Sequence, residues 1–165
     1  MSETVSSWLS GRLPDEWFEG APEVSVDREE ILVVGRLAAP EAGEDARAGE
    51  RGRIARFRED TREQRMRIAR EAEHHFGRKV AWGAVCGETR VTFTSLSIPV
   101  MTRLRQPERL VLDTLVEAGV ARSRSDALAW CVRLVGDHTS DWLTALRDAL
   151  QSVQKVREAG PEAAG

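Results

Sequence analysis

The sequence predicts an α+β fold in which a small N-terminal hairpin unit precedes a helix–hairpin–three-helix domain. Two pairs of apolar segments, in residues 23–37 and 79–94, are each joined by a few polar or glycine residues, which is typical of a β-hairpin. Most other apolar residues recur at intervals of three and four, the period of an amphipathic helix. We therefore assign an acidic helix and hairpin unit to residues 1–40, a linker to residues 41–52 and an α+β domain to residues 53–160.

The acidic N-terminal unit begins with two short helical turns. Apolar side chains in residues 5–19 have helical spacing, which is interrupted at Gly11 and Pro14. Two strands follow, at Glu23–Asp27 and Glu30–Leu37, and their short charged connection predicts a hairpin. The linker that comes next is rich in glycine and predicts a loop.

The α+β domain opens with the strongest helical pattern in the chain, over residues 53–76, and Gly77 is its expected end. The exposed face of this helix carries many arginines: Arg56, Arg58, Arg62, Arg65, Arg67 and Arg70. Glutamates lie between them, so one interpretation is a solvated face with helical ion pairs. The other interpretation is a basic surface that docks on RNA or on an acidic partner.

A second hairpin and three helices complete the domain. Residues 79–86 and 89–94 form the hairpin, and a bulge near Thr94 allows the strand to continue to Ile98. Pro99 ends strand pairing because proline has no N–H to donate. The three helices are expected at residues 107–118, 124–135 and 139–158.

Charge is distributed unevenly along this chain of net charge −3. Residues 1–50 contain 12 acidic and 4 basic side chains, whereas residues 51–109 contain 7 acidic and 14 basic ones. A basic middle segment indicates a polyanionic partner or contact with the acidic segment of the same chain.

The segment Ala118–Leu128, with the sequence AGVARSRSDAL, resembles the turn and second-helix start of ribbon-helix-helix DNA-binding proteins. The resemblance extends over residues 92–135. It implies that Thr92–Ile98 is a strand, which pairs with the same strand of a second copy and enters the DNA major groove. It also implies a homodimer that regulates transcription, with Ser123–Asp126 opening the second helix against a DNA phosphate.

The residues of this cluster suit that role on physical grounds. Ser123 is a good N-cap, and Asp126 three positions later completes a variant of the capping box. A helix N-terminus presents N–H donors and partial positive charge to an anion, and a two-stranded ribbon fits the major groove. The residues expected to contact DNA are Thr92, Thr94, Ser97, Arg103, Arg105, Ser123, Arg124 and Ser125.

The rival function is that of a protein–protein adaptor or of an accessory protein of the ribosome or polymerase. In that case the acidic unit binds a protein partner through Trp8, Trp17 and Phe18, because aromatic side chains often anchor interfaces. The other three tryptophans, Trp82, Trp130 and Trp142, lie among apolar neighbours and are expected in the core.

Other classes of function find little support in the sequence. His74 and His75 are adjacent on a helix and face different directions, so no metal site is expected. Cys86 and Cys131 lie in apolar surroundings and are expected to be reduced, buried thiols. No glycine-rich nucleotide loop or catalytic arrangement is present, so we expect neither an enzyme nor a cofactor. Without a membrane span or a secretory signal, the expected location is the cytoplasm.

Overall fold

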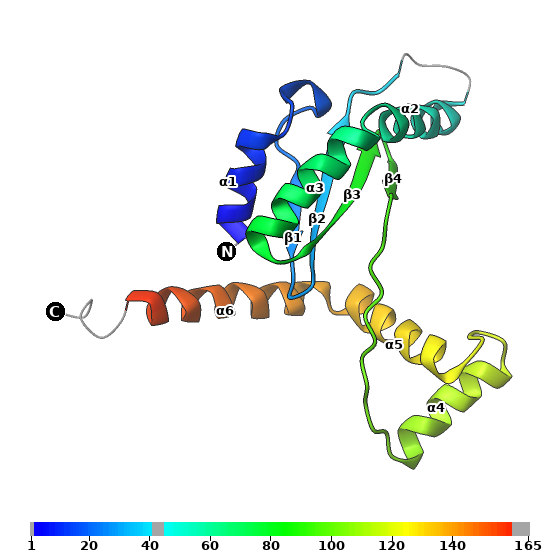
Figure 1. Cartoon of the computed structure of the whole chain (residues 1–165). Helices are drawn as coiled ribbons and strands as arrows, with labels where there is room; N and C mark the ends of the chain where they lie inside the picture. The colour runs from blue at the N-terminus through cyan, green and yellow to red at the C-terminus, as the bar shows by residue number, and fades with distance from the viewer. Residues whose placement is uncertain (1, 41–44, 160–165) are drawn as a thin grey trace. The chain divides into compact units, whose positions relative to one another are not determined.

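The computed structural model describes residues 2–40 and 45–159 and confirms the α+β class (Figure 1). The chain divides into two compact units, Met1–Pro99 and Val100–Gly165. The first unit contains a four-stranded sheet with helices, and the second contains helices only. Within the described ranges, no helix is both long enough and apolar enough to cross a lipid bilayer.

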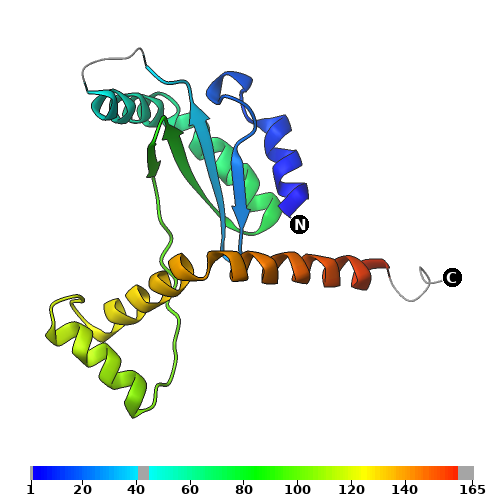
Figure 2. The same ribbon diagram turned by 180° about the vertical axis from the view of Figure 1, so that it is seen from behind.

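The two predicted hairpins form one sheet rather than two separate units (Figure 2). The strands β1 (Glu23–Val26), β2 (Glu30–Leu37), β3 (Lys79–Cys86) and β4 (Thr89–Thr92) lie side by side in chain order. Antiparallel pairs β1–β2 and β3–β4 are joined by a parallel pairing of β2 with β3. The central strands are apolar at successive positions, as strands covered on both faces usually are. The predicted boundary at residues 41–52 therefore lies inside the first unit.

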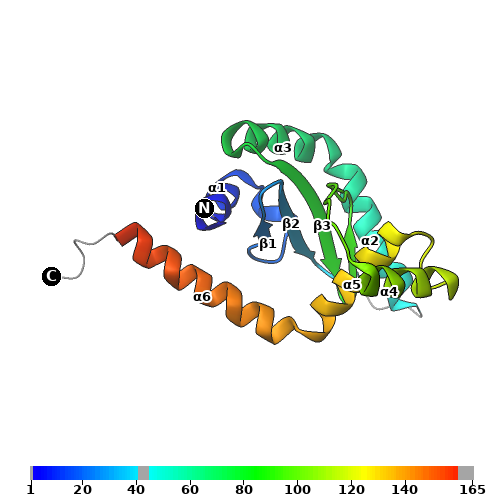
Figure 3. The same cartoon turned by 90° about the horizontal axis from the view of Figure 1, so that it is seen from below.

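Two helices connect β2 to β3 along one side of the sheet (Figure 3). Helix α2 (Ala46–Asp60) begins inside the predicted linker, because the Asp45 carboxylate caps it by accepting a 3.0 Å bond from the N–H of Ala48. The rest of that linker includes residues 41–44, which lie outside the described residues. Helix α3 (Arg62–Phe76) ends at Gly77, as predicted.

The single helix predicted over residues 53–76 is broken at Thr61. This residue ends α2 with φ −97° and ψ 1°, and α3 begins after it. Its hydroxyl donates a 2.6 Å bond to the carbonyl oxygen of Phe57. Threonine side chains that bond to the preceding turn commonly bend helices, and the apolar spacing does not reveal such a bend.

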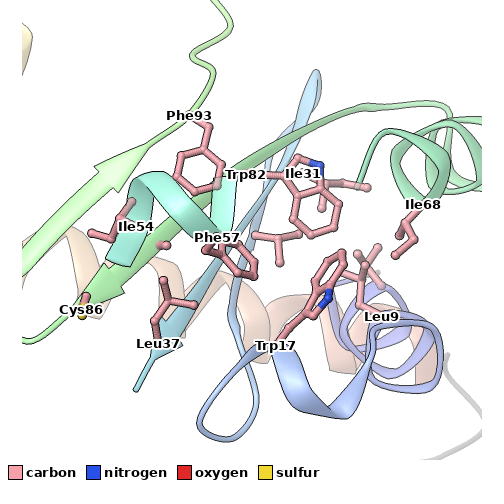
Figure 4. Close-up of a cluster of buried hydrophobic side chains, with 13 residues drawn as sticks. Leu9, Trp17, Ile31, Leu37, Ile54, Phe57, Ile68, Trp82, Cys86 and Phe93 are labelled. Atoms are coloured by element: carbon pink, nitrogen blue, oxygen red, sulfur yellow. The ribbon is translucent and has the colours of Figure 1, made fainter. Parts of the chain in front are cut away.

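The core of the first unit lies between the sheet and its helices (Figure 4). Alternate residues of β2 and β3 supply one side of it, and α2, α3 and helix α1 (Ser2–Arg12) supply the other. Trp17 belongs to the 3-10 turn Asp15–Trp17. The centroid of its ring lies 5.6 Å from that of Phe57 and 6.1 Å from that of Trp82. Trp17 is buried, and both Trp8 and Phe18 pack against the same core. These aromatic side chains thus stabilise the unit, and buried Trp17 offers no surface to the protein partner expected from the sequence.

The second unit has a much smaller core. Helices α4 (Gln106–Glu117) and α5 (Arg124–His138) pack together over the buried residues Leu112, Ala121 and Ala127. Helix α6 (Ser140–Ala159) has no buried residue, although it is strongly amphipathic. Trp142 on this helix is 61% exposed, so its predicted core position is wrong within the single chain. The two other tryptophans expected in the core differ: Trp82 is buried and Trp130 is half-buried.

Candidate nucleic-acid interface

The start of α5 has the capping geometry that the sequence predicts. Ser123 has extended backbone angles, and its hydroxyl accepts a 3.2 Å bond from the N–H of Asp126. The Asp126 carboxylate in turn accepts a 3.0 Å bond from the N–H of Arg122. This backbone hydrogen bond lowers the pKa of Asp126 below its ordinary value. The reciprocal bonds fix the first turn of α5 and the direction in which it points.

Two backbone donors of that first turn remain for a ligand. Within residues 2–40 and 45–159, the N–H groups of Arg124 and Ser125 have no hydrogen-bond acceptor, whereas the next two N–H groups both bond to Ser123. Both residues are exposed. Free N–H groups at the positive end of a helix dipole are suited to an anion such as a phosphate.

The Arg124 guanidinium is already engaged, which the sequence did not reveal. It makes a two-pronged ion pair with the Asp113 carboxylate of α4, at 2.6 and 2.8 Å. The bond lowers the pKa of Asp113 and raises that of Arg124. Arg124 therefore joins α4 to α5, and its side chain can contact a phosphate only in competition with Asp113.

The residues just before α4 lie beside the start of α5. A pocket of about 320 Å³ is lined by Thr102 and Leu104 of this segment, by Arg109 of α4 and by Arg124 and Ser125 of α5. Leu104 also packs against the core of the second unit, and its carbonyl oxygen accepts a 2.8 Å bond from Arg109. Leu104 thereby holds the end of this segment close to the free N–H groups.

The strand predicted at Thr92–Ile98 does not form. Strand β4 ends at Thr92, and residues 94–99 belong to no helix or strand. Phe93 still bonds to the sheet, because its N–H donates a 2.7 Å bond to the carbonyl oxygen of Trp82, and its ring is buried against Phe57. Residues 94–99 pair with no strand, so the predicted bulge and continued pairing are wrong.

The predicted contact residues consequently fall into two groups. Thr92, Thr94 and Ser97 are exposed but belong to the first unit. The second unit contains Arg103, Arg105, Ser123, Arg124 and Ser125. Thr102 and Arg109, which line the pocket, were missed. The direct connection of residues 100–105 to α4, with apolar Leu104 at its end, is the signal that could have identified this segment.

The histidines and cysteines form no ligand cluster. His75 stacks on Trp8 with ring centroids 6.3 Å apart, and His74 is exposed in the last turn of α3. Burial raises the pKa of the Cys86 thiol, and Cys131 is half-buried and unpaired. In the part of the chain that the structure describes, no three His, Cys, Asp or Glu side chains are grouped as metal ligands.

The architecture is that of a two-unit α+β protein with a capped helix pair in its second unit. The family model of the Rv1265-like protein N-terminal domain matches residues 3–92, and that of the Mb1296 C-terminal domain matches residues 105–157. Two similar relatives are the uncharacterized proteins Mb1296 of Mycobacterium bovis and Rv1265 of Mycobacterium tuberculosis. Each is 56% identical over 159 residues, which are 96% of this chain and 70% of the relative. The chain belongs to the Rv1265-like family. No solved structure is significantly similar to it.

Proposed function

We propose that this chain is a non-enzymatic DNA-binding protein, of the kind that regulates transcription, and that its second unit contacts the DNA. The observation that carries the proposal is the capped start of α5, where the N–H groups of Arg124 and Ser125 are free beside a segment that contains Arg103 and Arg105. The N–H groups bind a backbone phosphate, and the arginines contact further phosphates or base edges.

The groove-binding segment in this proposal is residues 100–105 and not Thr92–Ile98. Side chains of an extended segment point alternately to opposite sides. Arg105 has extended backbone angles, and Leu104 packs against the core of the second unit, so the exposed side chains of Arg103 and Arg105 lie on the side away from that core. In a ribbon formed with a second copy, that side faces the major groove.

The same proposal explains the exposed apolar surface of the second unit, which a second copy of the chain covers. Three buried side chains are too small a core for independent stability. Several large apolar residues of α5 and α6 are exposed: Val132, Val135, Trp142, Leu146, Leu150 and Val153. A homodimer buries them and places two α5 starts on one DNA molecule.

The dimer is tested by light scattering on the 165-residue chain as it elutes from a size-exclusion column. We expect twice the chain mass of 18.4 kDa. Leu150→Glu, which puts a charge on the apolar stripe of α6, should shift the population to monomer. Gln151→Glu adds the same charge at the next, exposed position and should leave the dimer intact. A monomeric wild-type chain, or equal effects of both variants, would refute the dimer.

DNA binding is tested by titrating fluorescent duplex DNA at several salt concentrations. Because bound arginines release condensed counterions, affinity should fall by orders of magnitude between about 50 and 200 mM salt. Arg103→Gln and Arg105→Gln should each weaken binding and reduce the slope of the logarithmic salt plot by about one. Arg147→Gln on α6 removes the same charge elsewhere in the second unit and serves as the control. Absence of binding at about 50 mM salt, where phosphate contacts are strong, contradicts the proposal.

The Asp113–Arg124 ion pair allows a more specific test. Asp113→Asn releases the Arg124 guanidinium at the free N–H groups and should tighten DNA binding, whereas Arg124→Gln should not. If the pair only joins the helices, Asp113→Asn weakens binding or leaves it unchanged. Thermal midpoints of both variants show whether the helix pair remains folded.

A protein–protein adaptor is the second candidate, and the exposed apolar stripe of α6 favours it. If DNA does not bind and the chain is monomeric, the stripe is open to another protein, and the adaptor function becomes the better proposal.

A further inference from the structure

An arginine-lined pocket of about 350 Å³ lies in the first unit, where α2 faces the β3–β4 hairpin. Its basic residues are Arg51, Arg58 and Arg62. Arg51 and Arg58 are seven positions apart on α2 and so share one of its sides, whereas Arg62 is the first residue of α3. Val91 and Phe93 contribute apolar surface to the same pocket. The pocket thus combines several guanidinium groups with an apolar wall.

The positive charge of this pocket is not neutralised by nearby carboxylates. Glu59 is the one acidic residue of the described lining, against three arginines. Within residues 2–40 and 45–159, no carboxylate oxygen lies within 4.0 Å of the guanidinium nitrogens of Arg51, Arg58 or Arg62. An unbalanced group of this kind attracts an anion.

A fourth arginine, Arg65, lies against the ring of Phe93 and adds to the positive charge near the pocket. It is 5% exposed, and its guanidinium carbon lies 4.9 Å from the centre of the Phe93 ring. Its bonds go to the Thr61 hydroxyl and the Arg58 carbonyl oxygen, which are both uncharged. Burial, with smaller contributions from Arg58 and Arg62, lowers the pKa of Arg65 to about 10. The arginines therefore repel one another, and an anion between them removes that repulsion.

We infer that this pocket binds a nucleotide, with the phosphate between Arg51, Arg58 and Arg62 and the base or sugar against Val91 and Phe93. Guanidinium groups form paired hydrogen bonds with phosphate oxygens, and the two charges of a terminal phosphate match the excess positive charge. The apolar wall favours a phosphate that carries a ring over inorganic phosphate. The nucleotide is either free or part of a single strand of nucleic acid. This site does not depend on the second unit or on DNA binding there.

Calorimetric titration of the 165-residue chain at low salt tests the site with three probes: inorganic phosphate, adenosine monophosphate and a short single-stranded oligonucleotide. Arg58→Gln and Arg62→Gln should each weaken binding about tenfold or more, since each removes a charge-assisted hydrogen bond to the phosphate. Arg56→Gln and Arg70→Gln remove equal charges from exposed positions on α2 and α3 outside the pocket lining and should change binding less than about threefold. Arg51→Gln provides a third pocket variant should either of the first two lower the thermal midpoint.

The three probes separate the possible outcomes. Stronger binding of adenosine monophosphate than of inorganic phosphate supports a free nucleotide, and binding of the oligonucleotide alone supports a nucleic acid strand. Equal losses in the pocket and control variants would show that the arginines act only as general surface charge, which overturns the inference. Absence of saturable binding for all three probes overturns it as well.

Discussion

Trp17→Ala is expected to lower the free energy of unfolding by about 3–5 kcal/mol, which is the usual cost of removing a buried aromatic side chain. The Trp17 ring is 6% exposed and meets the rings of Phe57 and Trp82 edge-on. Its removal leaves a cavity where α2, the sheet and the 3-10 turn come together. Denaturant unfolding, followed by far-ultraviolet circular dichroism, measures the change.

Met66→Ala is the matched control, because it also shortens a large apolar side chain in the first unit. Met66 is 47% exposed on α3, so the expected change is about 0.5 kcal/mol or less. If Trp17→Ala has the same free energy of unfolding as the wild type, Trp17 is not a core residue. The prediction that it anchors a protein partner would then stand again.

Gly35→Ala is expected to destabilise the first unit by about 1–3 kcal/mol through overpacking. Gly35 lies in β2, and a Cβ atom there would overlap the ring of Phe18. Since Phe18 packs into the core beside Trp17, the ring cannot move without disturbing its neighbours. The thermal midpoint should fall by several degrees.

Two further variants test this explanation. Gly11→Ala, in α1, adds a methyl group where no atom lies within 4 Å, and it should be neutral or stabilise by about 0.5–1 kcal/mol because alanine favours helix. Combining Gly35→Ala with Phe18→Leu should cost less than the sum of the single changes, since the smaller side chain makes room for the methyl group. Strict additivity would mean that the Phe18 ring is not the cause.

Local patterns predicted most elements of the fold but not their long-range pairing. The two hairpins, the start of α5 at Ser123 and the end of α3 at Gly77 depend on residues close in sequence, and the structure confirms them. The parallel pairing of β2 with β3 joins residues far apart, such as Leu37 and Cys86, and periodicity contains no information about it. For this reason the boundary between the two units was predicted at residues 41–52, which belong to the first unit of the structure.

The candidate interface was predicted only in part, and the reason is the same. The Ser123 cap is local and was found, whereas the ion pair between Asp113 and Arg124 depends on how two helices pack. The groove-binding segment was placed at residues 92–98 by the resemblance to ribbon-helix-helix proteins, in which a strand precedes the two helices. The structure instead uses Phe93 as a core residue of the first unit.

The parallel pairing of β2 with β3 also constrains how the protein can fold during synthesis. The first hairpin is complete at Leu37, but the β2 edge that carries Ile31 and Val33 has no partner until β3 has emerged from the ribosome. At about 5–20 residues per second, that interval lasts a few seconds. During this interval the unpaired edge of β2 is available to other chains, and exposed strand edges are a common starting point of aggregation. Eight charged residues from Asp15 to Glu30 lie in or next to the hairpin and are well placed to discourage such contacts until β3 is synthesised: Asp15, Glu16, Glu19, Glu23, Asp27, Arg28, Glu29 and Glu30.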